Sequence, residues 1–309
     1  MIKWKVYLLL TCITQLALAG FNDYSIGARP LGFGGAFVAL ADDGNAASYN
    51  AAGLGFIEQS QFSVTRMQRF RGLVNHNQVS AIVPAGSVGT IGTSIGILGE
   101  KNGIYKEQLI TVSYSKSLSQ KFALGSNLRS FTTNFDQEHE SIQENPYFQE
   151  KQSASAISMD IGVMAKSITG LSVGLSVENL LPADIAISNS QQDIVPRNVR
   201  IGVGYKLGGI NTLIQQESLR GLLASGQGQV EIAFRDGNSH LRVGAEIWAS
   251  ESVAFRAGYA LKSGVNSVTT MALGTSLKFS MVRLDYVFQV LSGDMKNNAV
   301  QLYSLNLIF

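Results

Sequence analysis

Apolar and polar residues alternate with a period of two along most of the chain after Gln61. In the segment 281–290, one set of alternate positions is entirely apolar and the other is mostly polar: Val282, Leu284, Tyr286, Phe288 and Val290 against Arg283, Asp285 and Gln289. Alternate side chains of a β-strand point to opposite faces. Segments of about ten residues with this alternation, separated by turn residues, are typical of transmembrane β-barrels.

The alternation predicts fourteen strands, an even number, as in single-chain bacterial barrels. These are 61–70, 77–84, 88–98, 107–116, 121–131, 155–165, 170–179, 197–207, 228–235, 240–248, 252–261, 269–279, 281–290 and 299–309. A soluble β-sandwich also alternates. We favour a barrel because one face is continuously apolar, whereas the other mixes charges with glycine. The predicted fold is an all-β, transmembrane antiparallel β-barrel of about 14 strands over 61–309.

Long and short connections alternate along the chain, which suggests an orientation. If the first strand runs outward from the periplasm, the long loops 132–154 and 180–196 lie outside the cell, as is usual for such barrels. The segment 208–227 breaks this rule, and it is either a periplasmic docking element or a sign of a miscounted strand. Glycine weakens strands, so the glycine-rich strand 88–98 is where we expect any lateral gap.

The stretch 27–54 differs from the rest of the chain because it is rich in glycine and alanine. Its glycines permit a tight backbone path. Asp42 and Asp43 stand where helix N-caps belong, ahead of the helix-compatible run 45–52, and Gly53 stands at a C-cap position. We predict that 20–60 forms a plug, or hatch, of helix and loop inside the barrel. The residues assigned to this plug are Gly32, Gly34, Gly35, Asp42, Asp43, Asn50 and Gly53.

The first 19 residues have the pattern of a secretory signal peptide. Lys3 and Lys5 precede an apolar core over 7–18, and 17–19 reads Ala-Leu-Ala, a typical cleavage site. Cys12, the only cysteine, lies inside this segment; it fits a lipoprotein anchor less well, because a threonine precedes it. After removal of the signal peptide we expect the protein in the cell outer membrane, in contact with outer-membrane lipid.

The last strand ends on an aromatic residue. Four alternate residues share its apolar face: Tyr303, Leu305, Leu307 and Phe309. This ending resembles the C-terminal signal by which outer-membrane barrels are recognised by the barrel assembly machinery, whereas an ordinary closing strand would not require a terminal aromatic residue. We therefore assign these four residues as an assembly signal.

Charged residues make up 15% of the chain and the net charge is +2. No basic patch with interleaved aromatic residues is present, so we expect no nucleic acid partner. The histidines, all placed in outer loops by the predicted strands, lack metal-ligand spacing, and no glycine motif has the spacing of a nucleotide loop. Ser239 and His240 are adjacent on a strand and point to opposite faces. We predict no metal, no cofactor and no enzymatic activity.

The inward face of the predicted barrel carries charges of both signs. The assigned polar network of the lumen comprises Arg200, Glu231, Arg242, Glu246, Arg256, Arg283 and Asp285. Buried charges are stable only when paired, which favours pairing of these residues with one another and with the plug. The alternative is that they line a route or bind an anionic head group.

Several segments together resemble a known family. Residues 27–43 and 49–54, the stretch 177–182 and the closing strand are similar to the PorV/PorQ family of outer-membrane proteins, which are related to the FadL fatty-acid transporter group. The N-terminal motif is the most specific of these. It departs from the family pattern at one position, because Ala51 follows Asn50 where the family usually has proline.

This resemblance implies a fourteen-stranded barrel with an N-terminal hatch and one of two functions. Proteins like PorV and PorQ serve type IX secretion and receive or anchor exported proteins at the cell surface. Proteins like FadL pass hydrophobic small molecules through a lateral opening. The partners implied are a secretion-system channel or exported proteins in the first case and an apolar ligand in the second. The acidic and aromatic loop 132–154 is either solvated or a partner-docking loop.

Replacement of Phe309 by alanine tests the assembly signal. We expect several-fold less folded protein in the outer membrane, because the terminal aromatic residue of the recognised strand is lost. The measurement is heat-modifiable migration in unboiled gel samples of isolated outer membranes. Normal levels of folded Phe309→Ala protein would contradict the assignment.

Overall fold

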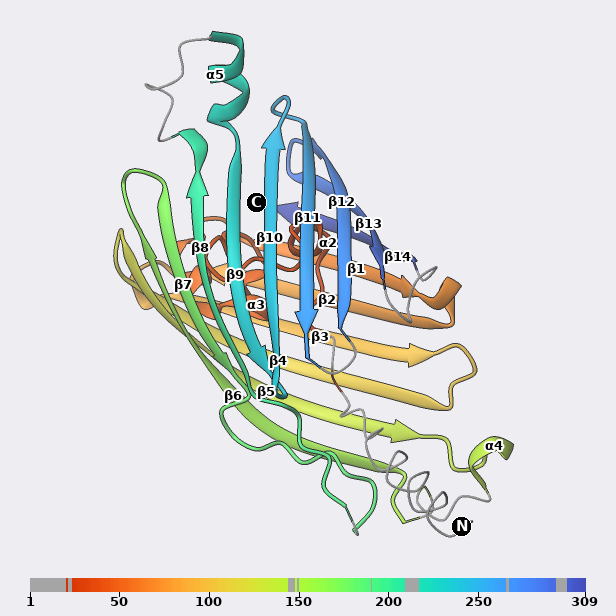
Figure 1. The fold of residues 1–309 in the computed structure, drawn as a ribbon. Helices are drawn as coiled ribbons and strands as arrows, with labels where there is room; N and C mark the ends of the chain where they lie inside the picture. The colour runs from red at the N-terminus through yellow and green to blue at the C-terminus, as the bar shows by residue number, and fades with distance from the viewer. Residues whose placement is uncertain are drawn as a thin grey trace, which may run out of the picture.

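The computed structural model describes residues 21, 24–143, 148, 150–189, 191–208, 217–264, 267–292 and 299–309. The predicted signal peptide lies outside the described residues. Fourteen antiparallel strands form a closed barrel in which β14 pairs with β1 (Figure 1). The strands are β1 Gln61–Arg69, β2 Val74–Pro84, β3 Thr90–Glu100, β4 Tyr105–Ser119, β5 Phe122–Phe135, β6 Ser153–Lys166, β7 Leu171–Glu178, β8 Asn198–Lys206, β9 Gln227–Arg235, β10 Asn238–Trp248, β11 Val253–Ser263, β12 Val268–Phe279, β13 Val282–Leu291 and β14 Ala299–Ile308.

The two faces of the barrel differ as the alternation predicts. On β4, Ile110 and Val112 point outward and are 38% and 51% exposed, whereas Thr111 and Ser113 between them point inward and are buried. An apolar exterior and a polar interior are expected of a barrel in lipid. The predicted fold class and the strand count are confirmed. No helix in the described part of the chain is long and apolar enough to cross a membrane.

The wall has no gap at the glycine-rich strand, so that prediction is wrong. β3 pairs with β2 over its entire length, from Thr90 to Glu100, and with β4 from Thr90 to Gly99. A Cβ at Gly92 would lie only 2.8 Å from Ile82 Cδ1. Glycine therefore makes room here for packing inside the barrel and does not interrupt the ladder.

The two ends of the barrel have different connections. We call the end with the tight turns 85–89, 120–121 and 167–170 the turn end, and the end with the connections 136–152 and 179–197 the loop end. At the turn end β8 and β9 are joined by the long segment 207–226, which contains α5 (Glu217–Ala224, at the top of Figure 1). Since β8 and β9 are adjacent antiparallel strands, this segment is a true connection and not a miscounted strand. The loop end carries α4 (Glu140–Gln143). Two short 3-10 helices connect neighbouring strands: η2 (Phe70–Gly72) joins β1 to β2 at the loop end, and η3 (Gly86–Val88) joins β2 to β3 at the turn end.

Two of the histidines lie on strands, contrary to the expectation that all occupy loops. His76 lies on β2 and His240 on β10, both near the loop end. β2 begins at Val74, three residues before the predicted strand, and therefore includes His76, whereas His240 was already the first residue of the predicted strand 240–248. Among the described residues no group of three His, Cys, Asp or Glu side chains is placed to hold a metal ion.

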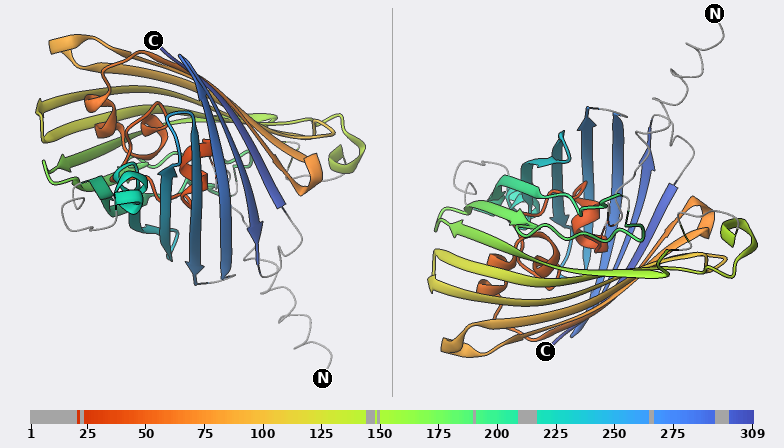
Figure 2. Two further views of the ribbon diagram at one scale, coloured as in Figure 1. Left: turned by 90° about the horizontal axis from the view of Figure 1, so that it is seen from above. Right: turned by 90° about the horizontal axis from the view of Figure 1, so that it is seen from below.

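The N-terminal segment from residue 24 to 60 lies inside the ring of strands, and both views in Figure 2 show α2 (Ala28–Gly32) enclosed by the wall. It continues through α3 (Ala46–Tyr49) and the 3-10 helix η1 (Ala51–Phe56). Phe33, Phe37 and the alanines around them are buried there. The plug thus supplies much of the apolar core of the barrel.

The helix expected over 45–52 is broken. Asn50 adopts an extended conformation between α3 and η1, and its Nδ2 donates to Val38 O (2.8 Å) and to Val163 O on the wall (3.1 Å). These contacts with plug and wall outweigh the local helix propensity of the alanines. The predicted caps also differ: Asn45 is the N-cap residue of α3, and Gly53 lies within η1.

The plug backbone approaches the wall most closely where the wall has glycine. A Cβ at Gly174 on β7 would overlap Val38 O. Gly34 of the plug has φ +66°, which favours glycine, and its α-carbon faces the Tyr259 backbone of β11. Contacts of this kind leave no room for side chains, so plug and wall are matched in shape.

Gly174→Val tests this shape match. We expect a loss of about 1–3 kcal/mol in unfolding free energy, as for overpacked cores. The control is Gly99→Val on β3, because the nearest heavy atom to a Cβ there is 4.0 Å away. The measurement is denaturant unfolding of the detergent-solubilised barrel, read by heat-modifiable migration. Equal effects of the two substitutions would contradict a tightly matched plug.

Candidate functional site

The candidate site is the interface between the plug and the inner face of the wall. Glu231 on β9 is fully buried, and its Oε2 accepts hydrogen bonds from Phe37 N (2.9 Å) and Val38 N (3.0 Å) of the plug. Two residues along the same strand, Gln229 Oε1 accepts from Ala39 N (3.2 Å) and Leu40 N (2.8 Å). One strand of the wall thus binds four consecutive backbone N–H groups, which would otherwise be buried without partners.

Two arginines of the wall neutralise Glu231. Arg200 on β8 donates from Nε to Glu231 Oε1 (2.8 Å) and from Nη2 to Gly35 O (2.7 Å). Its guanidinium also stacks over the Tyr49 ring of the plug, 4.6 Å from the centroid. Arg242 on β10 donates to the same carboxylate oxygen (2.9 Å). Arg200 therefore connects wall and plug directly.

A second group of charges is built around Arg29 in α2. Arg29 binds Glu246 on β10 in a bidentate manner, with Nε to Oε2 at 3.0 Å and Nη2 to Oε1 at 3.1 Å. Its Nη1 donates to Asp42 (2.6 Å) and Asp43 (3.0 Å) of the plug. Bidentate arginine–carboxylate pairs are among the strongest in proteins. Arg29 joins two parts of the plug to the wall.

The second group extends around the wall through three further strands. Arg256 on β11 contacts Glu246 and lies 3.5 Å from Asp285 on β13. Asp285 is also bound by Arg283 Nε (3.0 Å) and by Asn306 Nδ2 (2.8 Å) on β14. Arg283 in turn donates to Asp43 Oδ2 (2.8 Å), which closes the circuit back to the plug.

Two arginines keep the buried plug carboxylate of Asp43 ionised. Burial alone would raise the pKa of Asp43, but the Arg29 and Arg283 guanidiniums outweigh it and hold this pKa below its usual range. A carboxyl with a lowered pKa stabilises the fold above its unfolded pKa of about 3.9, and this stabilisation is lost as the pH falls through the folded value. The plug contacts of Asp43 therefore persist throughout the physiological range.

A third polar group lies nearer the loop end. Tyr24 of the plug donates from its hydroxyl to Glu178 Oε2 (3.1 Å), and the Arg129 guanidinium lies 4.8 Å from the centre of its ring. Arg129 pairs with Asp160 at 2.6 Å, and both side chains are buried. Burial and the nearby Glu178 carboxylate raise the pKa of Tyr24 to about 12, so the phenol remains a neutral donor.

The structure brings all seven predicted lumen residues into the first two groups, where they are bound to one another and to the plug. Sequence reasoning missed Arg29 and Gln229 as partners. Arg29 is marked by being the single basic residue of the segment 20–60. Gln229 is marked by its place two positions before Glu231 on the same strand, because residues two apart on a strand face the same side. The third group was also missed, because its members come from distant segments.

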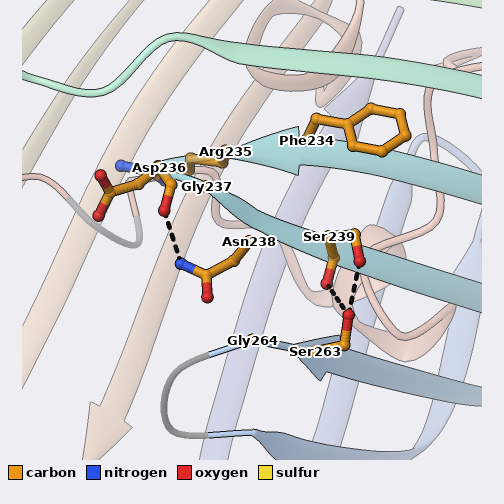
Figure 3. Close-up of a pocket in the computed structure, with 8 residues that line it drawn as sticks. All are labelled: Phe234, Arg235, Asp236, Gly237, Asn238, Ser239, Ser263 and Gly264. Atoms are coloured by element: carbon orange, nitrogen blue, oxygen red, sulfur yellow. Dashed lines mark hydrogen bonds between the residues drawn. The ribbon is translucent and has the colours of Figure 1, made fainter.

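Two hollows of the described structure lie at the loop end. One, of about 470 Å³, is formed by the β9–β10 turn and the end of β11 (Figure 3). Figure 3 shows Asn238 donating to Asp236 O and Ser239 bonded to Ser263. The other, of about 570 Å³, lies between the start of β6 and the connection 179–197, and its lining is largely polar.

The sequence comparison identifies the family. The profile of the type IX secretion system membrane protein PorP/SprF family matches residues 45–305, so the chain belongs to this family. The match does not confirm the PorV/PorQ assignment, and the glycine-rich part of the plug before residue 45 lies outside it. No curated protein sequence matches the chain significantly.

Solved structures of similar fold include hydrocarbon channels and transporters. The monoaromatic hydrocarbon channel CymD matches with a TM-score of 0.61 and 11% identity, over 94% of this chain and 98% of that one. The toluene transporter TbuX of Ralstonia pickettii has a TM-score of 0.60 at 12% identity (93% and 98%), and a FadL homologue of Pseudomonas aeruginosa has 0.58 at 10% (93% and 99%). At such identities the likeness shows the fold alone. Family and fold together indicate a membrane β-barrel of the outer-membrane type.

Glu246→Gln tests the role of the buried charges. Removing this anion leaves Arg29 and Arg256 without their shared partner, and we expect a loss of about 3–5 kcal/mol in unfolding free energy. Lys206→Gln is the matched control: its side chain is 57% exposed and lies 3.6 Å from Asp42, so its loss should cost at most about 1 kcal/mol. Denaturant unfolding measures both, and similar losses would show that the buried network does not hold the plug.

Proposed function

We propose that this protein is a plugged barrel that receives or holds exported proteins at the cell surface, as an accessory of type IX secretion. The family supports a part in that pathway. The observation that carries the proposal is the anchoring of the plug, in which four consecutive backbone N–H groups are bound by Glu231 and Gln229 and Arg29 is paired with both wall and plug. A plug bound in this way favours a sealed lumen.

The closed wall supports the same proposal. Every strand pairs with both neighbours, β6 with β7 over Ile161–Lys166 alone, and the one register shift within these ladders lies at the turn end of β4, between Ser117 and Ser119. With short turns facing the periplasm, the loop end faces the outside of the cell. A protein of this form offers partners its loop end, where the connections are longest and function most often resides.

Transport of hydrophobic small molecules is the alternative, and the similarity of fold to hydrocarbon transporters favours it. It would require the plug to move or the wall to open. No catalytic role is proposed, since the comparisons are to secretion and transport barrels. Fold alone does not decide between these functions.

Locking the plug distinguishes the two functions. Ala28 N donates to Ser304 Oγ on β14 (3.1 Å), so these two neighbouring positions are chosen for a pair of cysteines, and formation of the disulfide is verified by the gel shift that reduction produces. We expect cells with the oxidised Ala28→Cys, Ser304→Cys barrel to retain surface proteins as the wild type does, whereas cells without the barrel lose them. The measurement is mass spectrometry of shaved surface proteins, with the single variants as controls.

The same cells test the alternative. Toluene uptake that requires the barrel and stops when the disulfide forms would contradict the proposal and favour transport. Normal surface proteins in cells that lack the barrel would contradict it as well. A native pull-down in mild detergent, with bound proteins and lipids identified, then shows which class of partner is carried.

A further inference from the structure

The wall contains one strand whose outer part has a single strand neighbour among the described residues. β6 pairs with β5 from Ser153 to Ala165, but with β7 only from Ile161 to Lys166. Beyond that point the chain leaves β7: Leu180 N donates to Met159 O (2.9 Å). Residues 153–157 of β6 therefore present an open edge toward the loop end.

The direction of the backbone groups along this edge follows from the ladder. Lys166 N donates to Lys121 O (2.7 Å) and Phe135 N donates to Gln152 O (2.9 Å), so even-numbered residues of β6 bond toward β5. Antiparallel ladders alternate in this respect. Ser153, Ser155 and Ile157 thus direct their N–H and C=O groups away from β5, into the open side.

This edge lies at the limit of the apolar band. The outward residues of β6 change from Ile161 and Ile157, which is 60% exposed, to Ser155 and Ser153. Ser155 Oγ bonds Thr132 Oγ1 of β5 (2.9 Å), and both are exposed. Unpaired backbone groups are not tolerated in lipid, but in water an open edge is a template for another strand. The edge is therefore placed where a water-borne peptide can reach it.

The hollow of about 570 Å³ lies along the same edge. It is lined by Lys151, Ser153, Ala154 and Ser155 on one side and by Asp184, Ala186, Ser188, Asn189, Gln191 and Gln192 on the other. The far side is anchored: Ile185 is buried in the barrel, and Asn189 N donates to Glu150 Oε2 (2.5 Å). Amide and hydroxyl groups predominate in this lining, with one lysine and one aspartate. Its chemistry suits polar, uncharged side chains.

We propose that residues 153–157 of β6 bind an extended, polar segment of an exported protein as an added β-strand, with alternate side chains of that segment in the hollow. The inference rests on the proposed function for the source of the peptide. Strand addition obtains affinity from main-chain hydrogen bonds and specificity from pockets for alternate side chains. A second copy of the barrel is a poor occupant. Two barrels related by a two-fold axis normal to the membrane would place each edge N–H group opposite the N–H group of the same residue in the other copy, so neither group would find an acceptor.

The test uses the complete detergent-solubilised barrel and a fluorescent peptide of about nine residues in which threonine alternates with valine. We expect Ser155→Pro to weaken binding about tenfold or more, since proline removes an edge N–H without affecting the bonds to β5. Ser155→Ala is the matched control: it loses the same hydroxyl, retains the N–H, and should bind as the wild type does. Heat-modifiable migration verifies that both variants are folded.

A second probe requires no substitution. The same peptide with N-methyl groups on all of its backbone nitrogens has no N–H group on either edge, so it cannot form the ladder and should not bind. Equal binding of both peptides, or equal binding of the peptide by Ser155→Pro and the wild type, would overturn the inference. A wild-type barrel that sediments as a dimer, and that Ser155→Pro converts to a monomer, would overturn it as well, because the edge would then bind a second barrel.

Cells separate this inference from the proposed function. If deletion of the barrel removes surface proteins but Ser155→Pro does not, the proposed function stands and the strand addition falls. If Ser155→Pro abolishes peptide binding in vitro while deletion leaves surface proteins unchanged, the binding site stands and the proposed function falls. Loss of both peptide binding and surface proteins in Ser155→Pro supports both.

Discussion

Two buried carboxylates, Glu231 and Glu246, connect the wall to the plug. Each is shared between a guanidinium of the wall and groups of the plug: backbone N–H groups at Glu231 and Arg29 at Glu246. Because an unpaired buried charge is strongly destabilising, neither the wall nor the plug is stable in this form without the other. The remaining lumen contacts, including the glycine-matched surfaces, depend on the plug being held in that position.

This constraint bears on function. A lumen that must open for transport requires contacts that break at low cost, whereas here several charge-assisted bonds would break together. The similar hydrocarbon channels share the strand arrangement, yet a shared fold does not determine which part of the barrel carries out the function. In this chain the described hollows lie at the loop end, so recognition there is consistent with a barrel whose lumen stays filled.

Much of the site could be predicted from alternation alone. Once the strands were placed, Arg200, Glu231, Arg242 and the other lumen charges had to point inward, because side chains alternate between faces. Their partners could not be predicted, since strand pairs such as β9 with β8 and β10 are fixed only by the closed topology. The helix expected over 45–52 failed for a related reason: Asn50 is held by the wall, and no local pattern reports that contact.

The sequence by itself determined the class of fold, the number of strands and the polarity of the two faces, because these follow from a period of two and from turn residues. Only the tertiary structure decided that β3 is fully paired, that Arg29 spans plug and wall, and that the outer part of β6 has an open edge. Each of these depends on where separate strands end relative to one another. That relation is set by packing and register across the whole barrel, and not by any short stretch of chain.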